Sequence, residues 1–165
     1  MILELHNISI GRQIGQLSAM VGDGQMLSVM GASGAGKTTL LRALLGFVAV
    51  DGGHICIDCE LLTPQSAPYF RRQTAYVPQY LSCPEGCEEL ADGQWAGMTM
   101  DERYLWLLRE AVNSGHPLLI VDEPPLLLGA ETQQLVDSLL DYAVRQGRTV
   151  VAVNDRVGNE NVIQL

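Results

Sequence analysis

The strongest constraint on the fold is a glycine-rich segment, residues 31–38, which lies between a short apolar run and a stretch with helical spacing. The apolar run, Met26–Met30, is typical of a buried parallel strand, and residues 38–47 place apolar side chains on one face of a helix. The segment between them reads GASGAGKT and fits the pattern G-x-x-x-x-G-K-[ST] without a mismatch. Strand, loop and helix in this order predict a loop that cradles nucleotide phosphates.

Each position of this loop has an expected role. Lys37 is expected to reach the β- and γ-phosphates and Thr38 to bind Mg²⁺. Lys37 is the only lysine of the chain, since the other nine basic residues are arginines. A compact ammonium suits a phosphate contact, although biased base composition would also explain the scarcity of lysine. The residues expected to bind the nucleotide are Gly31, Ala32, Ser33, Gly34, Ala35, Gly36, Lys37, Thr38 and Thr39.

The rest of the chain alternates apolar runs with amphipathic stretches, which predicts an α/β fold with a mainly parallel sheet flanked by helices. A small N-terminal β region is expected to precede it. Ligands bind such sheets at the carboxyl ends of the strands, where the glycine-rich loop lies. Further strands are expected at 54–57, Thr74–Val77, Leu118–Val121, Thr149–Val153 and 161–165, and helices at 101–112 and 132–145.

Length and charge narrow the class of protein. The 165 residues fit one domain, 1–165. Ten basic residues against nineteen acidic ones, a net charge of −9, argue against nucleic acid as a partner, because binding to it relies on Lys and Arg. No apolar run reaches the roughly 18 residues that a membrane helix needs, and the N-terminus lacks the basic start of a signal peptide. A cytoplasmic protein is therefore expected.

A second acidic element follows the apolar strand Leu118–Val121. Asp122 comes directly after it and would hold Mg²⁺ through water at the edge of the sheet. The adjacent Glu123 would orient or deprotonate an attacking water. An acidic turn without a catalytic role is the alternative interpretation.

With the segment Y-V-P-Q ending at Gln79 and with Pro124 after Glu123, the chain resembles the ATP-binding subunit of ABC transporters. The resemblance implies the P-loop NTPase fold and ATP and Mg²⁺ as cofactors. It implies Glu123, Gln79 and Asn154 as catalytic residues, with Asn154 at the position of the family's switch histidine. It implies Thr38, Gln79 and Asp122 as the metal-binding residues.

Several positions depart from the family's pattern. The signature L-S-G-G-Q should precede the helix at 101–112, but residues 98–102 read MTMDE. Gly129 replaces the aspartate of the D-loop, and no aromatic residue lies near residues 8–11 to stack on adenine. The region 78–112 is short, which implies a reduced helical subdomain and therefore a smaller docking surface for a membrane partner.

Motifs that match the family and positions that depart from it lead to two alternative functions. The resemblance implies a protein that binds MgATP, dimerises as a homo- or heterodimer, and hydrolyses ATP to drive a transmembrane permease subunit at the inner face of the membrane. The departures favour the alternative, a catalytically weak regulatory or structural subunit that works mainly in a heterodimer. A P-loop protein without a role in transport is a more distant third.

The cysteines and histidines give a weaker signal. Cys56 and Cys59, and likewise Cys83 and Cys87, have spacings that resemble zinc ligands. Residues i and i+3 of a strand face opposite sides, so the first pair would chelate only if a turn started at Asp58. Plain thiols are the favoured interpretation, and metal binding stays open. The three histidines, His6, His54 and His116, are far apart in sequence and are not expected to be ligands.

Overall fold

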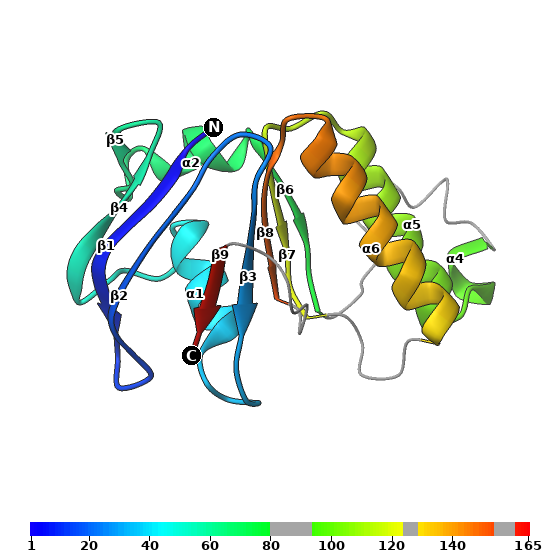
Figure 1. Ribbon diagram of the computed structural model, residues 1–165, viewed down its shortest axis with the longest axis horizontal. Helices are drawn as coiled ribbons and strands as arrows, with labels where there is room; N and C mark the ends of the chain where they lie inside the picture. Colours follow the sequence, from blue (N-terminus) through cyan, green and yellow to red (C-terminus); the bar gives the residue numbers. More distant parts are fainter. Residues whose placement is uncertain (80–93, 124–128, 154–160) are drawn as a thin grey trace.

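The computed structural model describes residues 1–79, 94–123, 129–153 and 161–165 and contains two sheets (Figure 1). The predicted site residue Asn154, together with Pro124, Cys83 and Cys87, lies outside the described residues. One sheet has five strands in the order β6-β7-β8-β3-β9, and the other has four in the order β2-β1-β4-β5.

All strand pairs of the five-stranded sheet are parallel, as the alternation of strands and helices predicted. Two of its inner strands, β7 and β8, are buried at every residue, because helices and the second sheet cover both faces. The predicted α/β fold and its strands are confirmed. The strands are β3 (Met26–Met30), β6 (Thr74–Val77), β7 (Leu118–Val121), β8 (Thr149–Val153) and β9 (Asn161–Gln164).

The four-stranded sheet is antiparallel and forms the predicted N-terminal β region. All four apolar side chains of β1 are buried and the polar residues between them are not, so one face of this sheet packs on the core and the other faces outward. Sequence analysis missed β2, where Gly15, Ser18 and Ala19 break the apolar alternation, and β5, which has only two residues. The strands are β1 (Leu3–Ile10), β2 (Ile14–Val21), β4 (Gly52–Ile57) and β5 (Glu60–Leu61).

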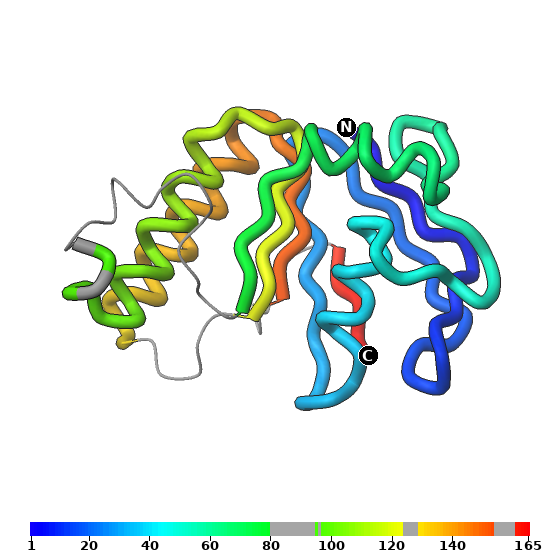
Figure 2. Tube along the Cα trace, turned by 180° about the vertical axis from the view of Figure 1, so that it is seen from behind, coloured from blue at the N-terminus to red at the C-terminus, as the bar shows by residue number. Residues whose placement is uncertain are grey.

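The helices complete a layered arrangement. Helix α1 lies between the two sheets, and α5 and α6 cover the opposite face of the parallel sheet (Figures 1 and 2). Alternate residues of β7 supply the two layers: Ile120 packs with the α1 side and Leu119 with the α5–α6 side. The helices are α1 (Lys37–Leu44), α2 (Ala67–Arg71), α4 (Gln94–Gly97), α5 (Met100–Asn113) and α6 (Ala130–Arg145).

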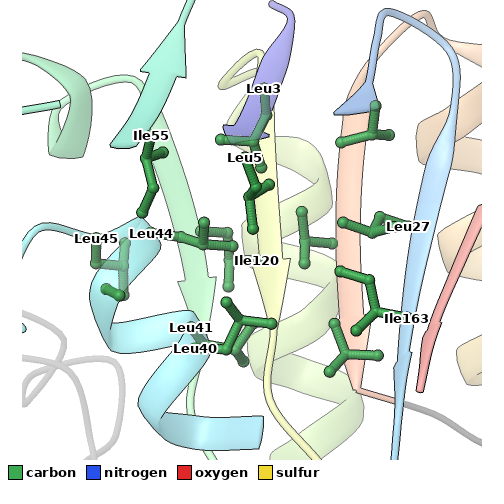
Figure 3. Packing of buried hydrophobic residues seen from close by; sticks show 14 of the residues in the cluster. Leu3, Leu5, Leu27, Leu40, Leu41, Leu44, Leu45, Ile55, Ile120 and Ile163 are labelled. Carbon is green, nitrogen blue, oxygen red and sulfur yellow. The ribbon is translucent and has the colours of Figure 1, made fainter. Parts of the chain in front are cut away.

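The core beneath α1 fixes where the glycine-rich loop points. Figure 3 shows Leu40, Leu41 and Leu44 of α1 among side chains from both sheets, including Leu5 and Ile120. These side chains are at most 2% exposed. Burying them along one face sets the direction of the helix and therefore holds its N-terminus at the carboxyl edge of the parallel sheet.

The structure corrects two details of the predicted helices. The first helix was expected over 38–47 but ends at Leu44, because Gly46 adopts a positive φ of 71° that stops it. Phe47, expected on the buried face, is 64% exposed as a result. The helix expected at 101–112 is α5, which the structure extends by one residue at each end. Within the described part of the chain, no helix is long and apolar enough to cross a membrane.

Candidate nucleotide-binding site

The loop between β3 and α1 follows the predicted path. Gly36 precedes the first residue of α1 with φ of 105°, a conformation that L side chains rarely adopt. A Cβ there would lie 3.2 Å from Cβ of Gln13 and 3.3 Å from Cγ1 of Ile14. Glycine at this position therefore lets the loop pass close beneath the turn between β1 and β2.

The N-terminus of α1 is unusually open. No side chain among the described residues caps it, and its first turn, which is described in full, holds no acidic residue. The first N–H groups of a helix have no partners within the helix and carry the positive end of its dipole. This helix end therefore offers N–H donors to an anion.

Lys37 places a cation beside these donors. The residue is 8% exposed, and its Nζ donates to the carbonyl oxygens of Gly31 at 2.7 Å and Ala32 at 3.1 Å. Oε2 of Glu123 lies 3.5 Å from the same Nζ. The two carbonyl contacts hold the ammonium inside the loop, where it would meet the phosphates of a nucleotide.

Asp122 follows β7 and is 1% exposed. Its Oδ1 accepts from the Thr38 hydroxyl at 3.3 Å and from the backbone N–H of Glu123 at 2.8 Å. The carboxylate of Asp122 and the hydroxyl of Thr38, which the sequence places 84 residues apart, thus form one oxygen-rich corner. Oxygen donors of this kind fit Mg²⁺, so the residues present suit the expected ion.

Two tyrosines to which the sequence analysis gave no role donate hydrogen bonds to Asp122. The Tyr76 hydroxyl donates to Oδ2 of Asp122 at 3.5 Å, and the Tyr104 hydroxyl donates to its backbone oxygen at 3.5 Å. Burial, followed by the charge of Asp122, raises the pKa of Tyr76 to about 12 and also raises the pKa of Tyr104. Both hydroxyls therefore keep their protons and act as donors. No sequence pattern indicated the Tyr76 contact, which arises because β6 pairs in register with β7, the strand directly before Asp122.

A cavity of about 170 Å³ joins most of the predicted site residues. Gln79 follows β6 and Glu123 follows β7, which are neighbouring strands of the sheet. Both residues therefore line the cavity beside the glycine-rich loop. The cavity is lined by Gln13, Ser33, Gly34, Gly36, Lys37, Thr38, Thr39, Gln79 and Glu123.

Gln13 is a cavity residue that no motif predicted. Its Nε2 donates to the carbonyl oxygen of Gly34 at 3.3 Å, and its Oε1 accepts from the Thr39 hydroxyl at 3.5 Å. It thereby links the turn between β1 and β2 to the middle of the loop and to the first turn of α1. A polar side chain in the turn after the first strand was the only signal in the sequence.

The segment at the signature position, 98–102, forms the start of α5 and differs sharply from the start of α1. Thr99 caps α5, and the Glu102 carboxylate accepts from the backbone N–H of Thr99 at 2.7 Å, which completes a capping box. Oδ2 of Asp101 accepts from the N–H of Gly129 at 3.1 Å and from the Thr132 hydroxyl at 2.9 Å. Carboxylates of this chain thus occupy the N-terminal ends of both α5 and α6.

Comparison with known protein families identifies the family of this chain. The family model described as "ABC transporter" matches residues 14–104, more than half of the chain. The chain is a member of the ABC transporter family. It is an ABC-type nucleotide-binding domain, as the motifs around Gln79 and Glu123 predicted.

Curated relatives of this ABC-type domain carry out several kinds of transport. The chain is 26% identical to the vitamin B12 import ATP-binding protein BtuD of Yersinia pseudotuberculosis, over 92% of this chain and 75% of that protein. It is 25% identical to the phosphonates import ATP-binding protein PhnC of Trichormus variabilis, over 95% and 84%. An ATP-dependent lipid A-core flippase of Ralstonia nicotianae is 25% identical over 81% of this chain and 29% of its own length.

Solved structures agree on the fold. An ATP-binding subunit of an ABC transporter superimposes with a TM-score of 0.76 at 21% identity, covering 94% of this chain and 80% of that one. A putative ABC transporter ATP-binding protein from Pyrococcus furiosus gives 0.71 at 14% identity, covering 100% and 98%. The predicted P-loop fold is therefore confirmed.

Proposed function

We propose that this ABC-type domain binds MgATP at the cavity lined by Lys37, Thr38 and Gln79 and hydrolyses ATP to drive a transmembrane partner. The observation that carries the proposal is the meeting of Lys37, Glu123, Thr38 and Asp122 at the open end of α1. The names of the relatives, import ATP-binding proteins and a flippase, support coupling to transport. The chain would then sit at the cytoplasmic face of a membrane through its partner and act as a dimer of ATP-binding subunits.

Each side chain has a distinct part in this proposal. Lys37 exchanges its contacts with backbone carbonyls for phosphate oxygens, which are better partners for an ammonium because they are charged. Thr38, Asp122 and Gln79 hold Mg²⁺, which neutralises charge on the phosphates when it is bound. Tyr76 fixes one oxygen of Asp122 and leaves the other facing Thr38.

Glu123 is the proposed base or water-orienting group. Its side chain is 34% exposed, so water reaches it, and it stands 3.5 Å from Lys37. Binding of phosphates by Lys37 would release the Glu123 carboxylate from this pairing. A carboxylate next to the phosphates can then accept a proton from, or align, an attacking water.

A second candidate function is a subunit with weak hydrolysis that works beside a different ATP-binding chain. The specific observation in its favour is the closed start of α5, where Glu102 fills the capping box and Asp101 binds the N-terminus of α6. In the family this segment serves the nucleotide of the opposite subunit. Two carboxylates in this segment would repel the phosphates of a nucleotide bound by the opposite subunit. A dimer of two copies of this chain would therefore have a poor ATP site at its interface.

The deciding experiment measures ATP binding and hydrolysis by the purified chain and by Glu123→Gln. We expect the variant to bind ATP as the wild type does and to lose about 10²-fold or more of the turnover, because general-base catalysis contributes on that order. Glu131→Gln, which changes an exposed carboxylate at the start of α6, is the matched control and should keep full activity.

The outcomes separate the two functions. Turnover by the isolated chain that only Glu123→Gln removes supports the enzyme. Equal and negligible rates in both proteins, with ATP binding retained, would contradict hydrolysis by a self-pair and favour the second function. Absence of ATP binding in the wild type would contradict both.

A further inference from the structure

The outward face of the antiparallel sheet carries four side chains of the types that bind transition metals. In β1 and β4, Glu4 pairs with Cys56 and His6 pairs with His54, directly opposite each other across antiparallel strands. Side chains in such pairs lie on the same face of the sheet. We call this group the β1–β4 quartet.

Alternation along the strands fixes which face the quartet occupies. Four residues between or beside its members are buried against α1 and the parallel sheet, and Figure 3 shows three of them. Successive residues of a strand point to opposite sides, so the quartet points away from the core. These buried neighbours are Leu3, Leu5, Ile55 and Ile57.

His6 is in contact with two other members of the quartet. The rings of His6 and His54 stack with centroids 4.7 Å apart and planes 22° from parallel. Nε2 of His6 lies 3.1 Å from Oε2 of Glu4. Cys56, the fourth member, lies directly opposite Glu4 in the pairing of β1 with β4.

The composition of the chain makes the meeting of two histidines at this place unusual. The whole chain has three histidines, and two of them face each other here although 48 positions of sequence separate them. The chain also has a net charge of −9, a field that attracts cations. Distance in sequence had argued against any role for the histidines as ligands, and strand pairing removes that argument.

We propose that the β1–β4 quartet is a binding site for Zn²⁺, with His6, His54, Cys56 and Glu4 as its ligands. Two imidazoles, a thiolate and a carboxylate form a donor set that suits tetrahedral zinc. Zinc–ligand bonds of about 2.0–2.1 Å put neighbouring ligand atoms about 3.3 Å apart in a tetrahedron. The 3.1 Å between Nε2 of His6 and Oε2 of Glu4 is already close to that spacing.

Binding needs the side chains of the quartet to rotate from the positions they have in this structure. Among the described residues, no three His, Cys, Asp or Glu side chains yet converge on one point. His54 is exposed and Cys56 partly so, which leaves both able to turn toward His6 and Glu4. Directly opposed residues of paired strands have Cβ atoms about 4.5–5.5 Å apart, within reach of one ion.

The proposed zinc site is separate from the ATP site and does not depend on it. The cavity beside Lys37 is lined by other residues and offers oxygen ligands that suit Mg²⁺. Zinc binding and nucleotide binding can therefore be tested independently in the same protein.

The test is Zn²⁺ titration of the full chain after removal of bound metal, without nucleotide or Mg²⁺, in a Cys83→Ser, Cys87→Ser background. That background excludes the other cysteine pair as the source of binding. We expect one Zn²⁺ per chain and an affinity at least tenfold lower in His54→Gln and in Cys56→Ser. The matched controls are His116→Gln and Cys59→Ser, which should bind as the background does.

Cobalt gives a second measurement that a purely structural role would not affect. Co²⁺ in the site should show the intense visible bands of a tetrahedral ion and a thiolate charge-transfer band that Cys56→Ser removes. ATP binding should be unchanged in His54→Gln, which shows that the variant is folded. The proposal is overturned if the background binds no Zn²⁺, if both quartet variants bind it equally well, or if Cys59→Ser rather than Cys56→Ser removes binding.

Discussion

The N-termini of helices α1 and α5 differ in whether side chains of the protein satisfy their backbone N–H groups. Helix α1 begins at Gly36–Lys37 with no capping side chain in the described structure and no acid in its first turn. Helix α5 begins at Thr99 with a capping box and carries Asp101 and Glu102 in its first turn. The first leaves its N–H donors to a ligand, whereas the second satisfies them with its own side chains.

This difference shows how one physical feature serves either binding or stability. A helix end that binds an anion has to stay incomplete until the anion arrives, at a cost to the ligand-free protein of about 1 kcal/mol for the missing cap. A helix end that is fully capped stabilises the fold but has nothing to offer a phosphate. In this chain the N-terminus of α1, at Lys37, stays uncapped and open to an anion. The N-terminus of α5, at the signature position, is capped and stabilises the fold.

Lys37→Ala should have the largest effect, because it removes the buried cation at the open end of α1. Hydrogen bonds to charged groups contribute about 1.5–3 kcal/mol, so losing the phosphate contacts should weaken ATP binding on the order of 100-fold. Binding of a fluorescent ATP analogue measures this. Arg145→Ala, at the exposed far end of α6, is the control and should leave the affinity unchanged. Wild-type affinity in Lys37→Ala would show that the nucleotide binds elsewhere.

Thr39→Glu would give the start of α1 the acidic third residue that the start of α5 has. Thr39 is the third residue of the first turn, the position that Glu102 holds in the capping box. The new carboxylate should stabilise the nucleotide-free protein by about 0.3–1 kcal/mol through the helix dipole. It should weaken ATP binding about tenfold by repelling the phosphates.

The matched control for that exchange is Thr39→Gln, which has the same length without the charge. Urea unfolding and ATP titration, carried out on both variants, give the two quantities separately. Opposite signs for stability and affinity in Thr39→Glu, and small changes in Thr39→Gln, are the expected result. Equal ATP affinity in the two variants would mean that the charge of the α1 terminus does not govern binding.

The sequence predicted the α1 end much better than the α5 end. A motif of fixed spacing, placed between a buried strand and an apolar helix, specifies backbone geometry, so the loop and the positions of Lys37 and Thr38 followed from local signals. The capping box at Thr99 and Glu102 was also readable, since a threonine followed three residues later by glutamate is its usual sign. Against the family's pattern the same residues are a departure from the signature L-S-G-G-Q, and that resemblance gives no indication of a helix cap.

Contacts between distant segments were the part that sequence analysis could not supply. The hydrogen bonds from Gly129 and Thr132 to Asp101, from Tyr76 to Asp122, and from Gln13 to the loop each depend on how elements pack in three dimensions. Strand register had the same effect on His6 and His54. Periodicity predicts which face of an element is buried but not which other element will meet it.

Thr99→Ala tests the stabilising side of the comparison. It removes the hydroxyl that accepts from the Glu102 backbone N–H at 3.3 Å and caps α5. Replacing a capping threonine typically costs about 1 kcal/mol of stability. Urea unfolding should show this loss with ATP affinity unchanged. Ser138→Ala, an exposed position inside α6, is the control and should be neutral or slightly stabilising. An unchanged midpoint in Thr99→Ala would show that the cap contributes nothing.

The smallest expected effect is a pH dependence that arises at the α5 end. Hydrogen bonds from the Thr99 backbone and then from its hydroxyl lower the pKa of Glu102 below its ordinary value of 4.5. A carboxyl group whose pKa is lowered by folding stabilises the native state above its ordinary pKa, and this contribution is lost as pH falls through the lowered value. The stability difference between wild type and Glu102→Gln should therefore be present at neutral pH and disappear well below 4.5. Urea unfolding of both proteins across the acidic range measures it, and a difference that stays constant with pH would show that the charge of Glu102 does not act through the helix end.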